Sequence, residues 1–208
     1  TPQRLTESKN SQAPTSWHPS GRFLAFRETR VGATNTDIWI LPVEGSGASG
    51  WKPGKPWVFL EGPFNEDQAA FSPDGKWLAY QSDESGTDDI YVRPFPGPGG
   101  RWPISTAGGA FPRWSPKGSE LFYRTPDQRL WVVTYSVVGE SFRADKPRLW
   151  SEATFTERLA PRTRNFALHP DGRVAVLQTP ALPPDVQFGK VVVVQHWFEE
   201  LKRLVPAK

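Results

Sequence analysis

The sequence has no cysteine, which excludes disulfide bonds, thiolate zinc sites, iron–sulfur clusters and a cysteine nucleophile. Methionine is absent even at position 1, so we expect the chain to start inside a longer gene product or after processing. The longest purely aliphatic run is Val191–Val194, far too short to span a bilayer, so direct membrane insertion is not expected. A formal net charge of only +3 does not indicate a nucleic-acid-binding surface, so no nucleic-acid partner is expected.

Turn-forming and aromatic residues, in contrast, are abundant. The 22 proline and 18 glycine residues predict many turns. The 10 Trp and 13 Phe predict a folded core built from large rings rather than from aliphatic bulk.

A short pattern occurs four times along the chain. An aromatic or aliphatic residue is followed by Ser or His, then Pro, a variable residue and Gly, and then by a second apolar stretch. Proline fixes φ and glycine supplies a positive φ, so each copy predicts a strand end, a tight turn and a second strand. The copies are Trp17–Phe26, Phe71–Tyr80, Trp114–Tyr123 and Leu168–Leu177, and they begin 43 to 54 residues apart.

Two further strands are predicted in the repeat. Alternating β-branched and aromatic residues mark a third strand in each copy, at Asp37–Ile40, Asp89–Val92, Arg129–Val132 and Lys190–Val193. Proline-led segments mark an outer strand at Lys55–Glu61, Arg101–Thr106 and Lys146–Glu152, and Thr1–Glu7 fits the same pattern. Four strands at this period are typical of the blades of a β-propeller.

The predicted fold is therefore all-β, a propeller of about four antiparallel blades. We expect eight tryptophans to lie in strands and fill the space between blades: Trp17, Trp39, Trp57, Trp77, Trp102, Trp114, Trp131 and Trp150. A Gly-rich loop at Glu44–Gly54 is expected to be mobile, and His196–Leu204 is expected to form a short helix. The whole chain, 1–208, is predicted as one propeller domain or fragment, with an outer strand at 1–7, blade 1 at about 12–61, blade 2 at 67–106, blade 3 at 110–152, blade 4 at 163–195 and a C-terminal segment at 196–208.

The repeat resembles the WD40-like (PD40) repeats of TolB-type propellers, and Phe71–Val92 is the copy that matches best. The ending Trp197–Leu204 is similar to the C-terminus of propellers that close some bacterial receptor-like Ser/Thr kinases. That resemblance implies a C-terminal sensor or interaction domain in an extracytoplasmic compartment. The kinase motifs themselves, a Gly-rich loop, His-Arg-Asp and Asp-Phe-Gly, do not occur in the sequence.

Two arrangements of the blades remain open from the sequence. Residues 1–7 can complete the last blade and close a four-bladed ring. Alternatively, the chain is an arc of a six- to eight-bladed ring, and TolB-type propellers have six blades. An open arc exposes two apolar blade faces, so we expect it to self-associate or to need the missing blades.

The sequence gives little indication of catalysis or of a metal. It has no Gly-x-Ser-x-Gly motif, and its three histidines, His18, His169 and His196, lie in turns or at a strand end, so the chain is not predicted to be an enzyme or to use a cofactor. Carboxylates at Asp83, Asp88 and Asp89 surround Gly86 and give a weak calcium-loop pattern. The competing interpretation of this stretch is a solvated turn.

Binding of a protein or peptide is the function that the sequence favours. The long connection 157–165 carries Arg158, Arg162 and Arg164, and guanidinium groups bind carboxylates and phosphates. Three phenylalanines, Phe64, Phe111 and Phe155, are expected to be exposed on the same face, where aromatic and arginine side chains often dominate binding. The alternative function is the propeller domain of a serine-peptidase-like hydrolase or a lyase whose catalytic part is not recognisable in this chain.

Overall fold

A computed structural model describes residues 3–46, 49–139, 141–154 and 164–176. By its contacts the chain divides into two units, 1–178 and 179–208, and the described residues belong to the first. All regular structure in these residues is β-strand, and they include no helix long and apolar enough to cross a membrane. The predicted third strand Lys190–Val193 and the predicted helix His196–Leu204 lie outside the described residues.

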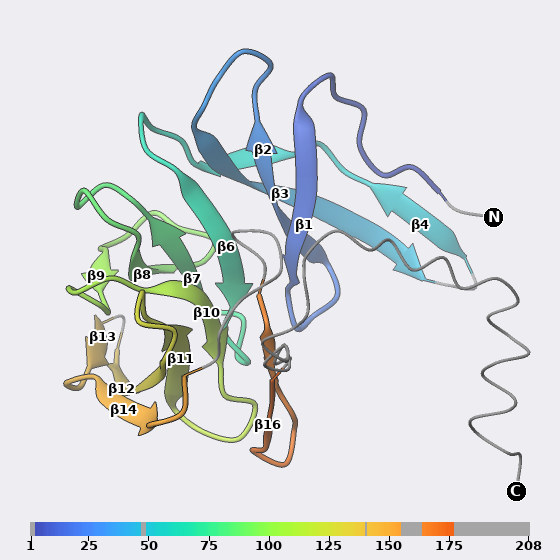
Figure 1. Cartoon of the computed structure of the whole chain (residues 1–208). Helices are drawn as coiled ribbons and strands as arrows, with labels where there is room; N and C mark the ends of the chain where they lie inside the picture. The colour runs from blue at the N-terminus through green and yellow to red at the C-terminus, as the bar shows by residue number, and fades with distance from the viewer. Residues whose placement is uncertain (1–2, 47–48, 140, 155–163, 177–208) are drawn as a thin grey trace, which may run out of the picture. The chain divides into compact units, whose positions relative to one another are not determined.

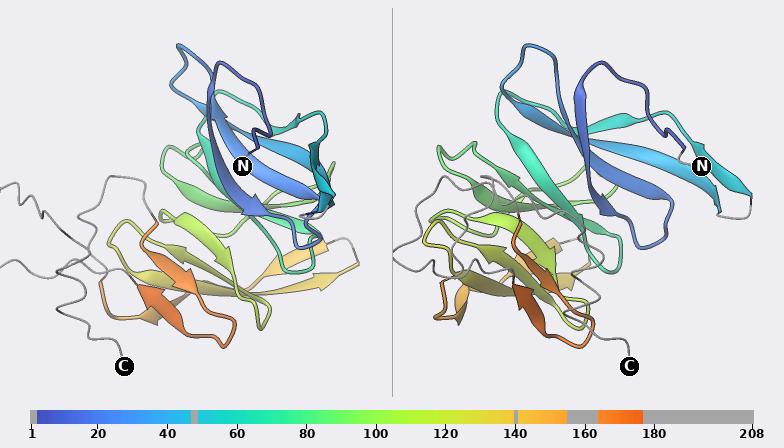
Figure 2. Two further views of the ribbon diagram at one scale, coloured as in Figure 1. Left: turned by 90° about the vertical axis from the view of Figure 1, so that its right-hand side faces the viewer. Right: turned by 45° about the vertical axis from the view of Figure 1, so that its right-hand side comes forward.

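Three antiparallel sheets follow one another in chain order, and they are called blades 1 to 3 (Figures 1 and 2). Blade 1 consists of β1 (Ser11–Trp17), β2 (Phe23–Thr29), β3 (Thr36–Ser46) and β5 (Trp57–Leu60). Blade 2 consists of β6 (Glu66–Phe71), β7 (Trp77–Ser82), β8 (Asp89–Pro94) and β9 (Trp102–Pro103). Blade 3 consists of β10 (Ala110–Trp114), β11 (Glu120–Arg124), β12 (Leu130–Val138) and β14 (Arg148–Ser151). A hairpin of β15 (Phe166–Leu168) and β16 (Val174–Val176) begins the fourth repeat.

Three of the four Pro-x-Gly turns form as the sequence predicts, at Gly21, Gly75 and Gly172, whereas Gly118 of the third copy does not adopt the predicted positive φ. In the second turn the Ser72 amide donates to the Trp77 carbonyl at 2.9 Å, and the Gly75 amide donates to the Ser72 carbonyl at 2.9 Å. Gly75 has a φ of +71°, a conformation that glycine adopts without steric cost. These turns define one side of each blade, the turn face. The opposite side, the loop face, carries the connections between second and third strands.

Two ribbons extend blades 1 and 3 beyond the predicted strands. β4 (Gly50–Pro53) pairs with the end of β3, and β13 (Ser141–Ala144) pairs with the end of β12. The Gly-rich stretch 44–54, expected to be a mobile loop, is therefore largely a hairpin. Val43 pairs with Pro53 and Glu44 with Lys52, so backbone pairing outweighs the low strand propensity of glycine there.

Each pair of neighbouring blades shares an apolar core. Blades 1 and 2 meet around Ile38, Ile40 and Leu78, and blades 2 and 3 meet around Trp77, Trp114 and Leu121. The β15–β16 hairpin packs on blade 3 through Phe166, which is 4% exposed. Rings of different blades touch throughout, for example Trp77 and Phe142 with centroids 5.1 Å apart.

The prediction that tryptophans fill the space between blades holds for Trp77 and Trp114 but is wrong for Trp17 and Trp150. Trp77 and Trp114 are 3% and 7% exposed, whereas Trp17 is 50% and Trp150 is 39% exposed. Trp17 has Phe71 and Trp114 as its equivalents, and both of these pack against the preceding blade. No blade precedes blade 1 in the part of the chain that the structure describes, so Trp17 meets solvent.

The segment 3–8 differs from its prediction, because none of these residues forms a strand. Instead Leu5 packs on the free face of blade 1, against Phe26, Leu41 and Val43. The Gln3 amide donates to the Trp51 carbonyl at 2.7 Å and ties the segment to β4. We call residues 3–8 the cover segment.

Candidate functional site

The same position in three repeats joins one blade to the next on the loop face. Arg27, at the end of β2, forms an ion pair with Asp67 of blade 2 at 3.1 Å. Its equivalent Gln81 accepts a hydrogen bond at 3.4 Å from the backbone amide of Phe111 in blade 3. The third member, Arg124, donates to Asn165 of the fourth repeat at 3.1 Å. These side chains fix the relative positions of the first strands, which surround the axis of a propeller.

The first strands of blades 2 and 3 contain a bulge at the positions that receive these links. Gln68 and Phe111 have φ values of +56° and +59°, and the strand register shifts at both places. A left-handed backbone is costly for a bulky residue such as phenylalanine. It is held here by the Gln81 link and by the Arg124 guanidinium, which lies 4.5 Å from the centre of the Phe111 ring. Strained residues of this kind concentrate at functional sites.

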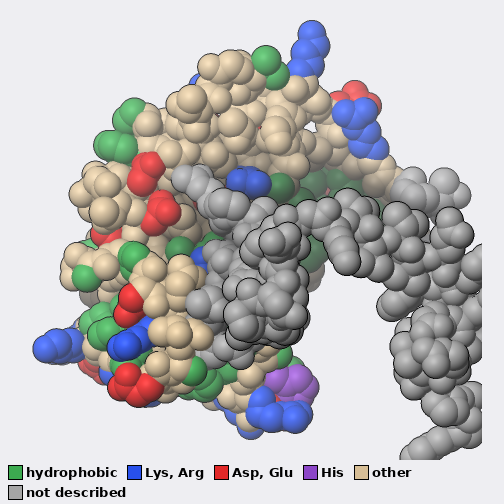
Figure 3. Space-filling view, viewed as in Figure 1, with side chains coloured by type: hydrophobic (Ala, Val, Ile, Leu, Met, Phe, Trp, Pro, Cys, Tyr) green, Lys and Arg blue, Asp and Glu red, His purple; other side chains and the backbone are tan. Residues whose placement is uncertain are grey.

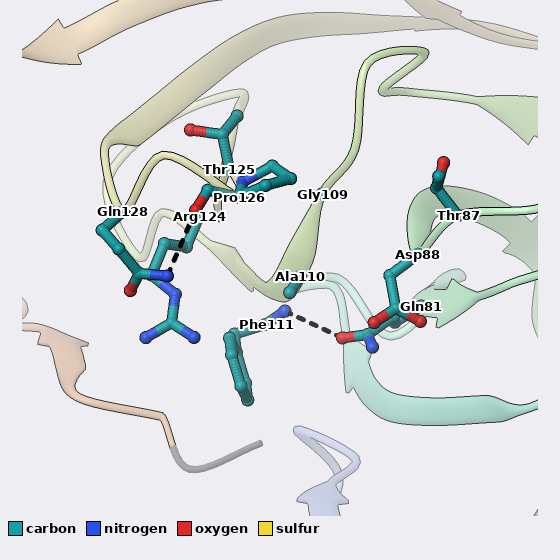
Figure 4. A pocket seen from close by; sticks show the side chains of 10 residues that line it. All are labelled: Gln81, Thr87, Asp88, Gly109, Ala110, Phe111, Arg124, Thr125, Pro126 and Gln128. Carbon is teal, nitrogen blue, oxygen red and sulfur yellow. Dashed lines mark hydrogen bonds between the residues drawn. The ribbon is translucent and has the colours of Figure 1, made fainter. Parts of the chain in front are cut away.

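A hollow of about 360 Å³ opens beside Phe111, between blades 2 and 3 (Figure 4). Figure 4 shows Arg124 and Gln128 of blade 3 on one side and the blade 2 residues Gln81, Thr87 and Asp88 on the other. The Gly109 amide donates to the Asp88 carbonyl at 2.6 Å, which brings the start of β10 against the β7–β8 loop. The hollow is lined by Gln81, Thr87, Asp88, Gly109, Ala110, Phe111, Arg124, Thr125, Pro126 and Gln128.

The three aspartates of the weak calcium pattern have separate roles in the structure. Asp83 accepts hydrogen bonds from the Asn65 backbone and side chain. Asp89 is 3% exposed and accepts from the Ser85 and Ser105 hydroxyls, each at 2.7 Å. Asp88 is half-buried at the hollow. Within the described ranges no three His, Cys, Asp or Glu side chains lie close enough together to hold a metal ion.

The other predicted site residues do not come together. Phe64 is exposed (40%) in the β5–β6 connection, as predicted. Phe111 is only 2% exposed, so the expectation that it is exposed is wrong: its ring lies beneath Arg124 and forms one wall of the hollow. Arg164 lines a different cavity, beside the first strands. Phe155, Arg158 and Arg162 lie outside the described residues.

Sequence reasoning missed the link residues Gln81 and Arg124. Each directly follows the aromatic residue that ends a repeat copy, Tyr80 or Tyr123, as Arg27 follows Phe26. In these copies that position carries a long side chain that can form hydrogen bonds. A comparison of the copies could therefore have indicated a shared role for it. What each side chain meets in the next blade, 30 to 41 residues further along, depends on the fold.

Neither of the two histidines that the structure describes contributes a catalytic pair to the hollow. The His18 ring donates from Nε2 to the Gly75 carbonyl at 3.0 Å, its Nδ1 lies 2.7 Å from the Ser20 hydroxyl, and the ring packs on Phe71. His169 lies 2.8 Å from Asp171, but both belong to an exposed turn on the turn face. His196 lies outside the part of the chain that the structure describes.

The loop face also contains a buried carboxylate. Glu66, at the start of β6, is 7% exposed, and burial raises its pKa to about 7, with the Asp37, Asp83 and Glu84 carboxylates adding to the shift.

On the surface visible in Figure 3, acidic and basic side chains are scattered among hydrophobic ones.

Comparisons with known proteins identify the fold. No protein-family model matches the sequence, and no curated protein matches it. Among solved structures, a TolB protein of Agrobacterium tumefaciens superposes with a TM-score of 0.50 at 21% identity, over 68% of this chain and 52% of that one. TolB from Acinetobacter baumannii superposes with a TM-score of 0.52 at 16% identity, over 85% of this chain and 40% of that one. The chain thus spans about half or less of the length of these proteins, and it has the TolB-like β-propeller fold.

Proposed function

We propose that this chain is part of a non-catalytic propeller that binds a protein or peptide through its loop face. The proposed site is the hollow between blades 2 and 3. Its composition supports this: a buried aromatic wall is combined with a few hydrogen-bonding side chains, which is typical of binding sites. An extracytoplasmic location, which the resemblance implies, stays a prediction.

Asp88 is the observation that carries the proposal. Its carboxylate is half-buried at the hollow, and the described residues supply no hydrogen bond to it. A carboxylate at the wall of a hollow can accept hydrogen bonds from a ligand, and a peptide offers backbone N–H groups, lysine, arginine or an N-terminal amine. We therefore propose that the ligand places a donor, preferably a cationic one, beside Asp88.

Peptide selection tests this proposal. Peptides selected from a random library on the 208-residue chain would be titrated against the wild type and against Asp88→Lys. We expect the affinity of the Asp88→Lys variant for these peptides to be about 10- to 100-fold lower. The reason is that the lysine either repels a cationic group of the peptide or leaves a peptide donor without its acceptor. Lys76→Glu is the control, since Lys76 lies in a turn on the turn face and carries the opposite change of charge. Equal affinities of the wild type and Asp88→Lys would contradict the proposed site.

A further inference from the structure

A second cavity, of about 440 Å³, lies beside the first strands and extends toward the turn face. Its walls come from the ends of β1, β6 and β10 and from the residue two places before β15. Four repeats therefore meet at this cavity, which is separate from the hollow between blades 2 and 3. The side chains that matter for its chemistry are Trp17, Phe71, Arg113, Trp114 and Arg164.

The charge of this cavity is entirely positive among the residues described. Arg113 and Arg164 both line it, and no aspartate or glutamate among the described residues does. Neither guanidinium has a described carboxylate oxygen within 4.0 Å, whereas Arg27 and Arg148 have one at 3.1 and 2.8 Å. Within the described ranges, the Arg113 guanidinium donates only to the Pro112 carbonyl, at 2.6 Å.

A ligand can reach both arginines, because Arg113 is partly exposed and Arg164 is exposed. Partial desolvation lowers the pKa of Arg164, although that guanidinium stays charged at any physiological pH. Trp17, Phe71 and Trp114 provide apolar walls, which strengthen the interaction of a guanidinium with an anion.

We propose that this cavity binds a small anion that carries several oxygens, a phosphate group or a carboxylate, between Arg113 and Arg164. Guanidinium groups present paired N–H donors that match both of these anions. The inference is independent of the peptide site, since it concerns different residues at a different place in the fold. In this proposal Arg164 and Arg113, which lie 51 positions apart in the sequence, contact the same anion.

Calorimetric titration of the 208-residue chain with sodium phosphate and with sodium succinate, at constant ionic strength, tests the proposal. We expect saturable one-to-one binding of at least one anion. The anion that binds with the higher affinity indicates whether the natural ligand carries a phosphate or a carboxylate. Arg113→Gln and Arg164→Gln should each weaken binding by 10-fold or more, since each removes one positive charge and its paired N–H donors.

Arg148→Gln is the matched control, because Arg148 lies on the outer strand of blade 3 and pairs with Glu120. Circular dichroism and a urea midpoint would establish that each variant is folded. If Arg113→Gln does not fold, Arg113→Lys can replace it, because lysine keeps the charge but lacks the paired N–H donors. This variant should bind the anion at least three-fold more weakly than the wild type. Absence of saturable binding, or equal affinities of the wild type and folded cavity variants, would overturn the proposal.

Discussion

At the scale of single residues, Glu66 is the group whose protonation should affect stability most visibly. Its pKa is raised from the ordinary 4.5 to about 7, so between these pH values the folded chain holds a proton that the unfolded chain has lost. The free energy of unfolding therefore falls as pH rises through this window. Above pH 7 the folded state carries the full cost of a buried carboxylate.

Replacement of Glu66 by glutamine should remove that dependence. Near pH 4.5 the two proteins should be similarly stable, and by pH 8 Glu66→Gln should be the more stable by roughly 1–3 kcal/mol. Urea unfolding followed by tryptophan fluorescence between pH 4.5 and 8 measures the difference. A difference that does not grow with pH would mean that Glu66 is ionised in the folded chain at low pH.

At the scale of elements, the tight turns contribute to blade packing as well as to chain reversal. Gly21 and Gly75 occupy equivalent turn positions with the same φ of +71°. A Cβ at Gly21 would meet no atom within 4 Å, whereas one at Gly75 would lie 2.2 Å from the His18 ring of blade 1. A substitution at Gly21 therefore measures backbone strain alone, whereas one at Gly75 measures backbone strain together with the contact between blades.

Alanine at these two positions should give unequal losses of stability. Gly21→Ala should cost about 1 kcal/mol, because only the left-handed backbone is strained. Gly75→Ala should cost about 1–3 kcal/mol more, since His18 must move and lose its hydrogen bond to the Gly75 carbonyl. Chemical denaturation of both variants provides the comparison, and equal losses would show that the His18 contact contributes nothing.

The elements themselves were largely predictable, for a local reason. The Pro-x-Gly turns and the alternating third strands are encoded within about ten residues, so their positions followed from the sequence. The ribbons that extend β3 and β12 were missed, because Val137 and Val138 are exposed and the Gly-rich stretch has weak strand propensity. The hollow was missed for another reason: Gln81 and Phe111 meet only through the packing of two blades.

At the scale of the whole molecule, the cover segment lies on an apolar face of blade 1 that no other described blade covers. Leu5 lies over Phe26, Leu41 and Val43 on the free face of blade 1. Whether the complete ring is closed or an arc stays a prediction.

Leu5→Ser should weaken the cover. We expect a loss of about 1–2 kcal/mol, because Leu5 is partly buried, and a larger fraction of dimers or higher oligomers in analytical ultracentrifugation. The control is Val31→Ser, which changes an apolar residue that is 78% exposed and should have little effect. Unchanged association and stability of Leu5→Ser would show that the cover segment does not protect this face.

The links between blades have a consequence for how such a chain can evolve. Arg27 faces a carboxylate, Gln81 a backbone amide and Arg124 the side chain of Asn165. If blade 3 directly followed blade 1, Arg27 would face the strand that carries Ala110 and Phe111, which offers no carboxylate. The repeats are therefore not interchangeable: duplication or shuffling of one blade would need compensating changes in its neighbour.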